Sequence, residues 1–454
     1  MPSRGRRSRR GESSRVVVQA PAQVFVGRAL IRGRVQSVEI GVDDDGEIVR
    51  IAKTIRGGER VDLGERLILP AATDVHVHLR EPGGSEAAEG FLSGTEAAAL
   101  GGVVAVADMP NTEPPVSDGE RLEAKISRAR GQLAVDAVIY AAVTDPRRVP
   151  GLAHLAGAFK LYLSPTSGEL TAPASGTVPD MLQAVGDSGL ALSVHAEDPG
   201  RFRARPSLAT VEEWDAHRPV EAELAGVDVL LAAPPSLRLN VAHVTNARVS
   251  SRVRSAGQCF EVTPHHLLLS TSGRSGPQLK VNPPLRSEPE RAALWSEFQA
   301  GAIPLLASDH APHSLESKGK PFELAPSGMP GVETMVPLLL EKVRAGELSL
   351  EVLLRAASDR PARWLGLPHG RLAPGSRAHF MIVDFRDRRE VRADRLRTAC
   401  GWSAFEGWPA VFPYRVYRSG ALIVEEGSFV GRSDGRVVRP DYALLRERDP
   451  EGRR

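Results

Sequence analysis

Cysteine, net charge and long apolar runs are all scarce in this chain of 454 residues, and each scarcity excludes a class of protein. Two cysteines, Cys259 and Cys400, are too few for a disulfide framework, so we expect a cytosolic protein. No apolar run is long enough to span a bilayer, and no membrane association is expected. The formal charge of +2, from 58 basic and 56 acidic residues, argues against a nucleic-acid-coating surface.

Both ends of the chain carry charge without apolar content. Residues 1–15 are rich in arginine and lack the apolar middle segment of a secretory signal, which predicts a disordered basic tail. Residues 441–454 form a similar charged tail. Neither tail is expected to take part in the fold.

Two β-rich flanks enclose a long middle region. In residues 16–69, short apolar runs alternate with turn residues and no helical periodicity is visible, and the same style returns in residues 369–440. We therefore predict a small β-sandwich that is assembled from both chain ends.

The middle region, residues 70–368, alternates apolar strand-like runs with helical segments such as 117–132 and 288–300, a pattern typical of parallel α/β folds. The predicted strands are 73–79, 103–109, 135–143, 158–163, 191–196, 239–244, 259–264 and 305–308. Eight strands over about 300 residues favour a closed (β/α)8 barrel of the TIM type, with a doubly wound open sheet as the alternative.

The first of these strands ends in two alternating histidines, His76 and His78. Because successive side chains of a strand point to opposite faces, these two share one face, with Asp74 behind them and Arg80 further along. Two imidazoles in this arrangement can bind one metal ion.

Further polar residues stand at the ends of other predicted strands, where the reactive groups of such barrels lie: Lys160, His195, His243 and Asp309. Imidazole and carboxylate are natural zinc ligands, and zinc-bound water ionises near neutral pH to a hydroxide nucleophile. Asp309 could bind a metal and also carry the proton that the hydroxide releases. Lys160 is either a bridging ligand, after reaction with CO2 to a carbamate, or a lysine that extends from a strand end to solvent.

With these residues in view, the chain resembles the dihydroorotases of the cyclic amidohydrolase superfamily, from about Leu63 to the C-terminal β segment. The motifs that carry the resemblance are the segments 74–83 (DVHVHLREPG), 109–112 (MPNT), 261–266 (EVTPHH), 280–286 (KVNPPLR), 307–313 (ASDHAPH) with Lys318, and 331–334 (GVET).

The resemblance implies a set of roles for individual residues. His76, His78 and Asp309 would hold one zinc, His195 and His243 a second, and carboxylated Lys160 would bridge the two. Arg80 and Asn111 would receive the substrate's carboxylate, His313 would make another substrate contact, and Asn282 would touch the ring. The planar fork of arginine agrees with carboxylate binding.

The implied reaction is the reversible, zinc-dependent closure of N-carbamoyl-L-aspartate to (S)-dihydroorotate and water, a step of pyrimidine (UMP) synthesis. A metal-bridging hydroxide would attack the ring carbonyl, with Asp309 as general acid and base. Two alternatives stay open: another cyclic amidohydrolase, such as an allantoinase or hydantoinase, or a catalytically silent scaffold for aspartate transcarbamoylase. Association with that transcarbamoylase and homo-oligomerisation are also left open.

Overall fold

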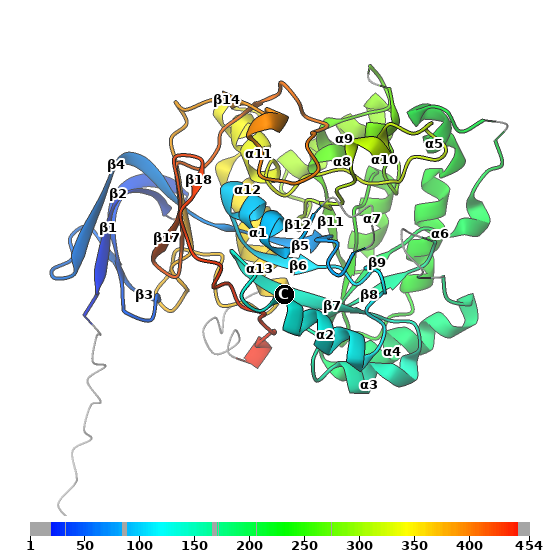
Figure 1. The fold of residues 1–454 in the computed structure, drawn as a ribbon, viewed down its shortest axis with the longest axis horizontal. Helices are drawn as coiled ribbons and strands as arrows, with labels where there is room; N and C mark the ends of the chain where they lie inside the picture. Colours follow the sequence, from blue (N-terminus) through cyan, green and yellow to red (C-terminus); the bar gives the residue numbers. More distant parts are fainter. Residues whose placement is uncertain are drawn as a thin grey trace, which may run out of the picture.

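The computed structural model describes residues 20–31, 33–83, 89–165, 170, 172–205, 207–273 and 275–443. The tail predicted at residues 1–15 lies outside these ranges, as does most of the tail predicted at residues 441–454. Figure 1 shows a barrel surrounded by helices, with a β domain beside it. Within the described residues, no helix combines the length and the apolar composition that crossing a membrane needs.

The β domain is one eight-stranded sheet to which both chain ends contribute, in the order β18-β17-β16-β13-β4-β1-β2-β3. Its strands are β1 (Gln23–Ile31), β2 (Arg34–Val42), β3 (Ile48–Ala52), β4 (Glu59–Pro70), β13 (Phe380–Val383), β16 (Arg415–Arg418), β17 (Ala421–Glu425) and β18 (Ser428–Phe429). The two ends meet where β4 pairs antiparallel with β13. Phe25 of β1 contacts the rings of Phe380 and Tyr417 edge-on, at centroid distances of 5.2 and 5.0 Å, and so joins both ends in one apolar core.

The middle of the chain forms the predicted parallel barrel, in the order β12 to β5. Its strands are β5 (Ala72–Val77), β6 (Val103–Asp108), β7 (Asp136–Ala142), β8 (Ala158–Tyr162), β9 (Ala191–His195), β10 (Arg238–Val241), β11 (Cys259–Val262) and β12 (Leu305–Leu306). A parallel bridge between Val77 and His310, with the His78 amide donating to the His310 carbonyl at 2.7 Å, joins the first strand to the last. The barrel and the β domain from both chain ends are thus confirmed.

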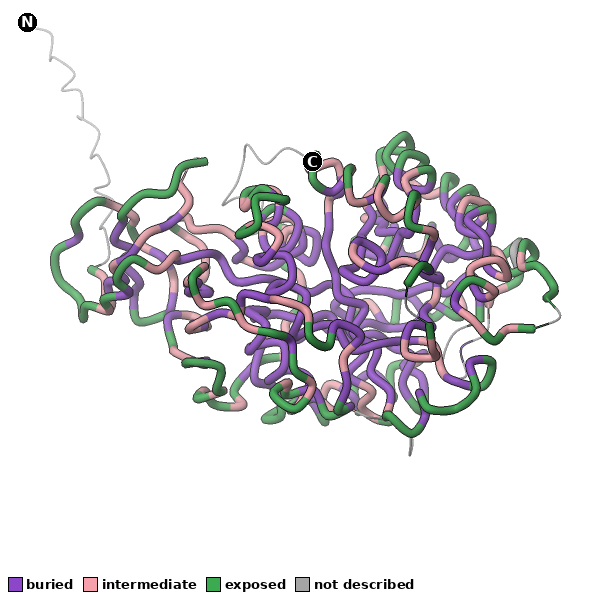
Figure 2. Tube along the Cα trace, turned by 90° about the horizontal axis from the view of Figure 1, so that it is seen from above, coloured by how far each residue is buried: buried purple, intermediate pink, exposed green. Residues whose placement is uncertain are grey.

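Helices connect the strands and cover the barrel: α1 (Phe91–Leu100), α2 (Gly119–Ala129), α3 (Val149–Leu152), α4 (Val178–Ser188), α5 (Val211–His217), α6 (Val220–Leu230), α7 (Ala247–Ser255), α8 (Pro264–Leu268), α9 (Glu288–Gln299), α10 (Leu315–Lys318), α11 (Met335–Arg344), α12 (Leu350–Leu354) and α13 (Arg360–Trp364). Capping side chains start several of them; Asp118 accepts the Arg121 amide at the start of α2. Burial is continuous along the barrel strands and falls off at the outer helices (Figure 2).

Small and β-branched side chains fill the barrel interior. Val75, Ala105 and Val138 belong to an apolar cluster that Trp364 and Leu365, at the end of α13, also join. The interior of the barrel is thus apolar, and the polar side chains lie at the carboxyl ends of the strands.

One segment of the C-terminal region leaves the eight-stranded sheet. Residues 389–410 begin and end in a separate two-stranded sheet, β14 (Arg389–Glu390) with β15 (Pro409–Ala410), which packs against α11. Between these strands, the Trp402 indole donates to the His313 carbonyl at 2.8 Å. The domain limits drawn at residues 69, 368 and 440 stay a prediction.

Candidate metal centre

A pocket opens at the carboxyl ends of the barrel strands. Eight of the ten residues singled out in the sequence line it: His76, His78, Arg80, Asn111, His195, His243, Asn282 and Asp309. The other two lie against these eight, since Lys160 Nζ is 3.5 Å from His76 Nε2 and His313 Nε2 is 3.1 Å from Arg80 Nη2. Residues from distant strands thus meet in one place.

His76, His78 and Asp309 form the tightest group. Asp309 Oδ1 lies 3.3 Å from His76 Nε2 and 3.1 Å from His78 Nε2, and all three residues are buried. Burial lowers the pKa of both histidines well below its ordinary value, so both rings are neutral. Neutral imidazole is the form of histidine that binds metal ions.

The second ring nitrogen of each histidine faces an oxygen acceptor. His76 Nδ1 contacts the Glu261 carboxylate, and His78 Nδ1 is 2.6 Å from Asn111 Oδ1. If both Nδ1 atoms donate, both Nε2 atoms carry lone pairs toward the Asp309 carboxylate. Three electron-rich atoms so close to one another repel unless a cation lies among them, so the residues present fit a metal ion.

His195 and His243 form a second pair beside the first. His195 Nδ1 is 3.1 Å from His243 Nε2, and the His76 and His243 rings are 5.3 Å apart between centroids. His195 Nε2 contacts Glu197 Oε2 at 2.7 Å, which turns Nδ1 toward the pocket. His243 Nδ1 has no hydrogen-bond partner among the described residues.

Lys160 is wholly buried beside His76. Burial lowers the pKa of its ammonium to about 8, although Glu261 and Asp309 nearby oppose the change. A fraction of the side chain is therefore free amine near neutral pH, and free amine is the form that adds CO2. Because Lys160 is fully buried, it does not extend to solvent, and its carboxylation stays a prediction.

Arg80 lines the pocket, and His313 lies against it, with Nε2 at 3.1 Å from Arg80 Nη2. Arg80 Nε is buried and has no hydrogen-bond partner among the described residues, which suits an anion that arrives with the substrate. Burial and the Arg80 charge lower the pKa of His313 to about 3, so His313 is neutral.

Strained backbone marks the same residues. Arg80, His243 and Asp309 have φ of 61°, 39° and 44°, in the left-handed region that side chains with a Cβ rarely adopt. Such strain costs about 1–3 kcal/mol per residue and concentrates at functional sites. The sharp turns at these residues aim their side chains into the pocket.

Sequence reasoning gave no role to Glu197 and Tyr162, and Glu261 entered through the motif at residues 261–266 and not as a partner of His76. Glu261 and Glu197 each contact a histidine of the site, and Tyr162 lines the pocket with a buried hydroxyl that has no described partner. A signal was present for two of them: Tyr162 and Glu197 each follow a predicted site residue by two positions at a strand end. Glu261 lies on β11, and only the closed barrel brings it to β5.

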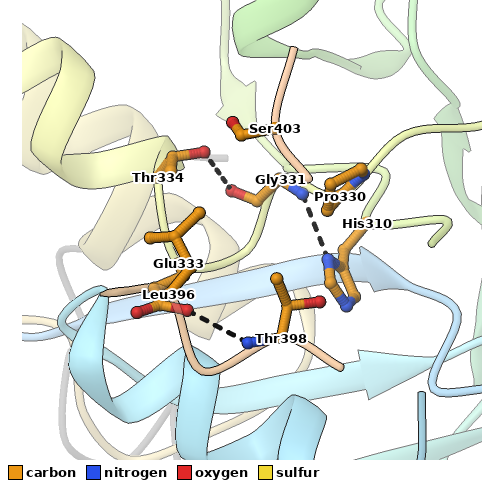
Figure 3. A pocket seen from close by; sticks show the side chains of 8 residues that line it. All are labelled: His310, Pro330, Gly331, Glu333, Thr334, Leu396, Thr398 and Ser403. Atoms are coloured by element: carbon orange, nitrogen blue, oxygen red, sulfur yellow. Dashed lines mark hydrogen bonds between the residues drawn. The ribbon is translucent and has the colours of Figure 1, made fainter. Parts of the chain in front are cut away.

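A smaller pocket is lined by His310, the residue after Asp309, together with residues near Gly331 and Thr398 (Figure 3). His310 Nδ1 accepts the Gly331 amide at 3.1 Å, and the Thr398 amide donates to Glu333 Oε2 at 3.4 Å. Thr398 belongs to the segment between β14 and β15, so that segment lies beside His310 and lines one side of this smaller pocket.

Glu261→Gln should weaken metal binding by about 10- to 100-fold, because a carboxylate that orients a liganding histidine typically contributes that much. The change keeps the size of the side chain and removes the charge that favours a proton on His76 Nδ1. Competition with a chromogenic chelator measures the affinity, and Glu123→Gln on the exposed side of α2 is the matched control. Equal affinities of the two variants would contradict the orienting role.

Comparison with known proteins agrees with this geometry. The model of the amidohydrolase family matches residues 67–420. Relatives named dihydroorotase include one from Halobacterium salinarum, 36% identical over 92% of this chain and 100% of its own length. Another, from Archaeoglobus fulgidus, is 34% identical over 87% of this chain and 97% of its own. The resemblance inferred from the motifs is thereby confirmed.

Among solved structures, an L-hydantoinase (dihydropyrimidinase) from Arthrobacter aurescens is similar, with a TM-score of 0.84 and 26% identity. The match covers 92% of this chain and 99% of that one. A dihydropyrimidinase from Brevibacillus agri, with a TM-score of 0.81 and 23% identity, shares the fold. Taken with the family match, these likenesses show that the chain belongs to the amidohydrolase family and is an enzyme of the cyclic amidohydrolase type.

Proposed function

We propose that this enzyme is a dihydroorotase. In pyrimidine synthesis it would close N-carbamoyl-L-aspartate to (S)-dihydroorotate with loss of water, and it would also catalyse the reverse hydrolysis. The relatives named dihydroorotase, at 32–36% identity over most of the chain, support this assignment. The single observation that carries it is the Arg80 guanidinium within the pocket, beside the candidate metal ligands. A ring that bears a fixed carboxylate needs a fixed cation in this place.

His76, His78 and Asp309 would hold one zinc ion, and His195 with His243 a second, with carboxylated Lys160 between them. The distances of 3.1–3.3 Å within the first group and of 3.1 Å within the second pair support this division. Zinc bound in such a set supplies water activation near neutral pH and polarisation of a carbonyl group.

Asp309 would move the proton. In the hydrolytic direction, water adds to the ring amide carbonyl as the C–N bond breaks, and Asp309 takes the proton from the water and returns it to the leaving nitrogen. In the closing direction, Asp309 removes a proton from the carbamoyl nitrogen and later protonates the departing hydroxide. A general acid–base group of this kind contributes about 10²- to 10⁴-fold to the rate.

Arg80, Asn111 and His313 would bind the substrate's carboxylate, and Asn282 would contact the ring. The buried Arg80 Nε without a described partner supports this role, because an arriving carboxylate would satisfy it. Asn282 lines the pocket and accepts the Trp214 indole N–H at 3.1 Å, which holds it in place.

A hydantoinase or allantoinase activity is the second candidate, and the likeness to the Arthrobacter aurescens L-hydantoinase favours it. Assays of dihydroorotate, hydantoin and allantoin side by side distinguish the candidates. We expect kcat/KM for dihydroorotate to exceed the other two values by at least about 10²-fold, because only this ring offers a carboxylate to Arg80. Preference for hydantoin would refute the proposal.

Zinc quantification on the purified protein accompanies these assays. Dialysis against a chelator should abolish hydrolysis of dihydroorotate, and added Zn²⁺ should restore it. Protein without bound zinc and without activity would favour the scaffold role beside a transcarbamoylase. The cytosolic location, a homo-oligomeric state and association with aspartate transcarbamoylase stay predictions.

A further inference from the structure

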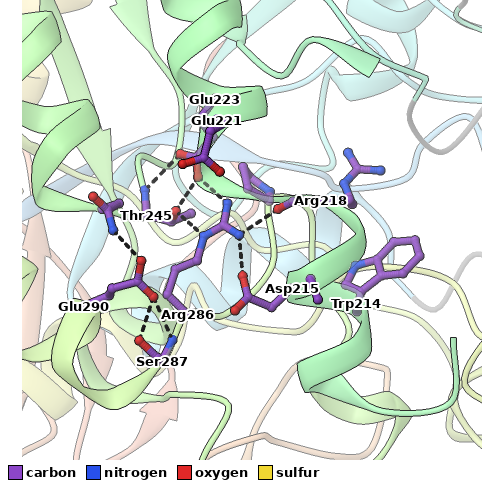
Figure 4. Close-up of polar contacts among 12 residues, drawn as sticks. Trp214, Asp215, Arg218, Glu221, Glu223, Thr245, Arg286, Ser287 and Glu290 are labelled. Atoms are coloured by element: carbon purple, nitrogen blue, oxygen red, sulfur yellow. Dashed lines mark hydrogen bonds and ion pairs between the residues drawn. The ribbon is translucent and has the colours of Figure 1, made fainter. Parts of the chain in front are cut away.

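Four charged side chains are buried near the second pair of histidines, and Figure 4 labels three of them, Arg218, Glu223 and Arg286. They are Glu197 at 0% exposure, Arg218 at 5%, Glu223 at 3% and Arg286 at 2%. They come from four places in the chain: the end of β9, the junction of α5 and α6, α6 itself, and the segment before α9. We call these four residues the charged cluster.

Arg286 is the centre of the charged cluster. Its Nη2 donates to Glu223 Oε1 at 2.5 Å, its Nε donates to Thr245 Oγ1 at 2.9 Å, and its Nη1 donates to the Arg218 carbonyl at 2.7 Å. Nη1 also pairs with Asp215 at 2.5 Å. The guanidinium thus joins α5, the α5–α6 junction and α6 to the turn that follows β10.

One branch of the charged cluster contacts a histidine of the site directly. Glu197 accepts from Arg218 Nε at 3.1 Å and contacts His195 Nε2 at 2.7 Å, so its position decides which way the ring points.

The other branch acts on the backbone after His243. Glu223 accepts the Thr245 amide at 3.2 Å and the Thr245 hydroxyl, two residues beyond His243. Because His243 has a φ of 39°, its ring direction depends on how firmly this turn is held. Among the described residues, no hydrogen bond or ion pair joins the charged cluster to His76, His78 or Asp309.

Stability alone is a poor reason for this arrangement. Four charges removed from water carry a large desolvation cost, and apolar side chains of similar volume often stabilise a fold as well or better. The benefit that charges add is geometric, because paired guanidinium and carboxylate groups fix one another's orientation.

We propose that the charged cluster is a positioning network that orients His195 and His243 together, and so determines the affinity of this half of the centre for its metal ion while the half at His76 and His78 is unaffected. The inference rests on the proposed function, since it assumes the second zinc ion. Glu197 contacts His195, Glu223 holds the turn after His243, and none of the four cluster residues lines the pocket.

The test counts zinc per chain in Glu197→Gln and Glu223→Gln, after dialysis at a fixed free Zn²⁺ concentration. Both changes keep the side chain's size while removing the partner of a buried arginine. We expect the wild type to retain two equivalents and each variant close to one, with second-site affinity lowered about 10- to 100-fold. Raising free Zn²⁺ by about 100-fold should restore both the second equivalent and kcat, with KM unchanged, which a merely unfolded variant would not do.

Glu221→Gln is the matched control, because Glu221 lies on α6 with Glu223 and, among the described residues, forms exposed ion pairs with Arg203 and Arg248. Two equivalents in both variants, at unchanged affinity, would overturn the inference. So would a wild type that hydrolyses dihydroorotate with one equivalent, which would leave the proposed function standing. A wild type with two equivalents but no dihydroorotase activity would refute that function and leave the positioning network to be judged by zinc content alone.

Discussion

Asp309→Asn is expected to reduce kcat for dihydroorotate by at least about 10³-fold while the fold is retained. The change removes the base that moves the proton, and that loss alone accounts for about 10²- to 10⁴-fold. It also removes the anionic member of the group formed with His76 and His78. Asparagine suits the left-handed φ of 44° at this position better than most residues, so the turn should keep its shape.

Activity at saturating Zn²⁺ and zinc content are measured together, so that loss of the metal is separated from loss of the proton carrier. The matched control is Asp187→Asn, an exposed aspartate near the end of α4, which should behave as the wild type. A variant with full zinc content and at least a tenth of the wild-type kcat would show that another group moves the proton.

The barrel could be predicted because its strands are apolar and β-branched and are separated by helical segments of ordinary length. All eight predicted strands are present, but several end early. The strand expected to reach Val244 ends at Val241, and the strand expected to reach Ser308 ends at Leu306. The reason is the left-handed backbone at His243 and Asp309, which no apolar pattern encodes.

The residues of the site could be predicted from histidines at strand ends, but the groups that orient them could not. Glu261 reaches His76 across 185 positions of the chain, and Arg286 reaches Glu223 across 63. Such pairs depend on barrel closure and on the packing of helices, which local spacing does not reveal. The position of residues 396–403 beside His310 could not be predicted either. The sequence pattern assigned that segment to the β domain.

Arg80→Met is expected to lower kcat/KM for dihydroorotate by about 10²- to 10⁴-fold, chiefly through KM. A carboxylate that loses two charge-assisted hydrogen bonds loses about 1.5–3 kcal/mol for each, and every 1.4 kcal/mol is tenfold. Methionine also carries a Cβ, so the strain at a φ of 61° is equal in both proteins. The unbranched side chain fills much of the same space, which leaves the His76–His78 pair in place.

The best control for Arg80 is a second ligand that lacks the carboxylate proposed to bind Arg80, rather than a second protein variant. N-carbamoyl-β-alanine matches N-carbamoyl-L-aspartate except for the carboxylate that the ring retains. As inhibitors of dihydroorotate hydrolysis, the two should differ strongly in affinity for the wild type and little for Arg80→Met, because only one of them can use the guanidinium. If the variant weakened both ligands equally, Arg80 would be supporting the shape of the pocket, and the argument for a dihydroorotase over a hydantoinase would lose its main physical basis.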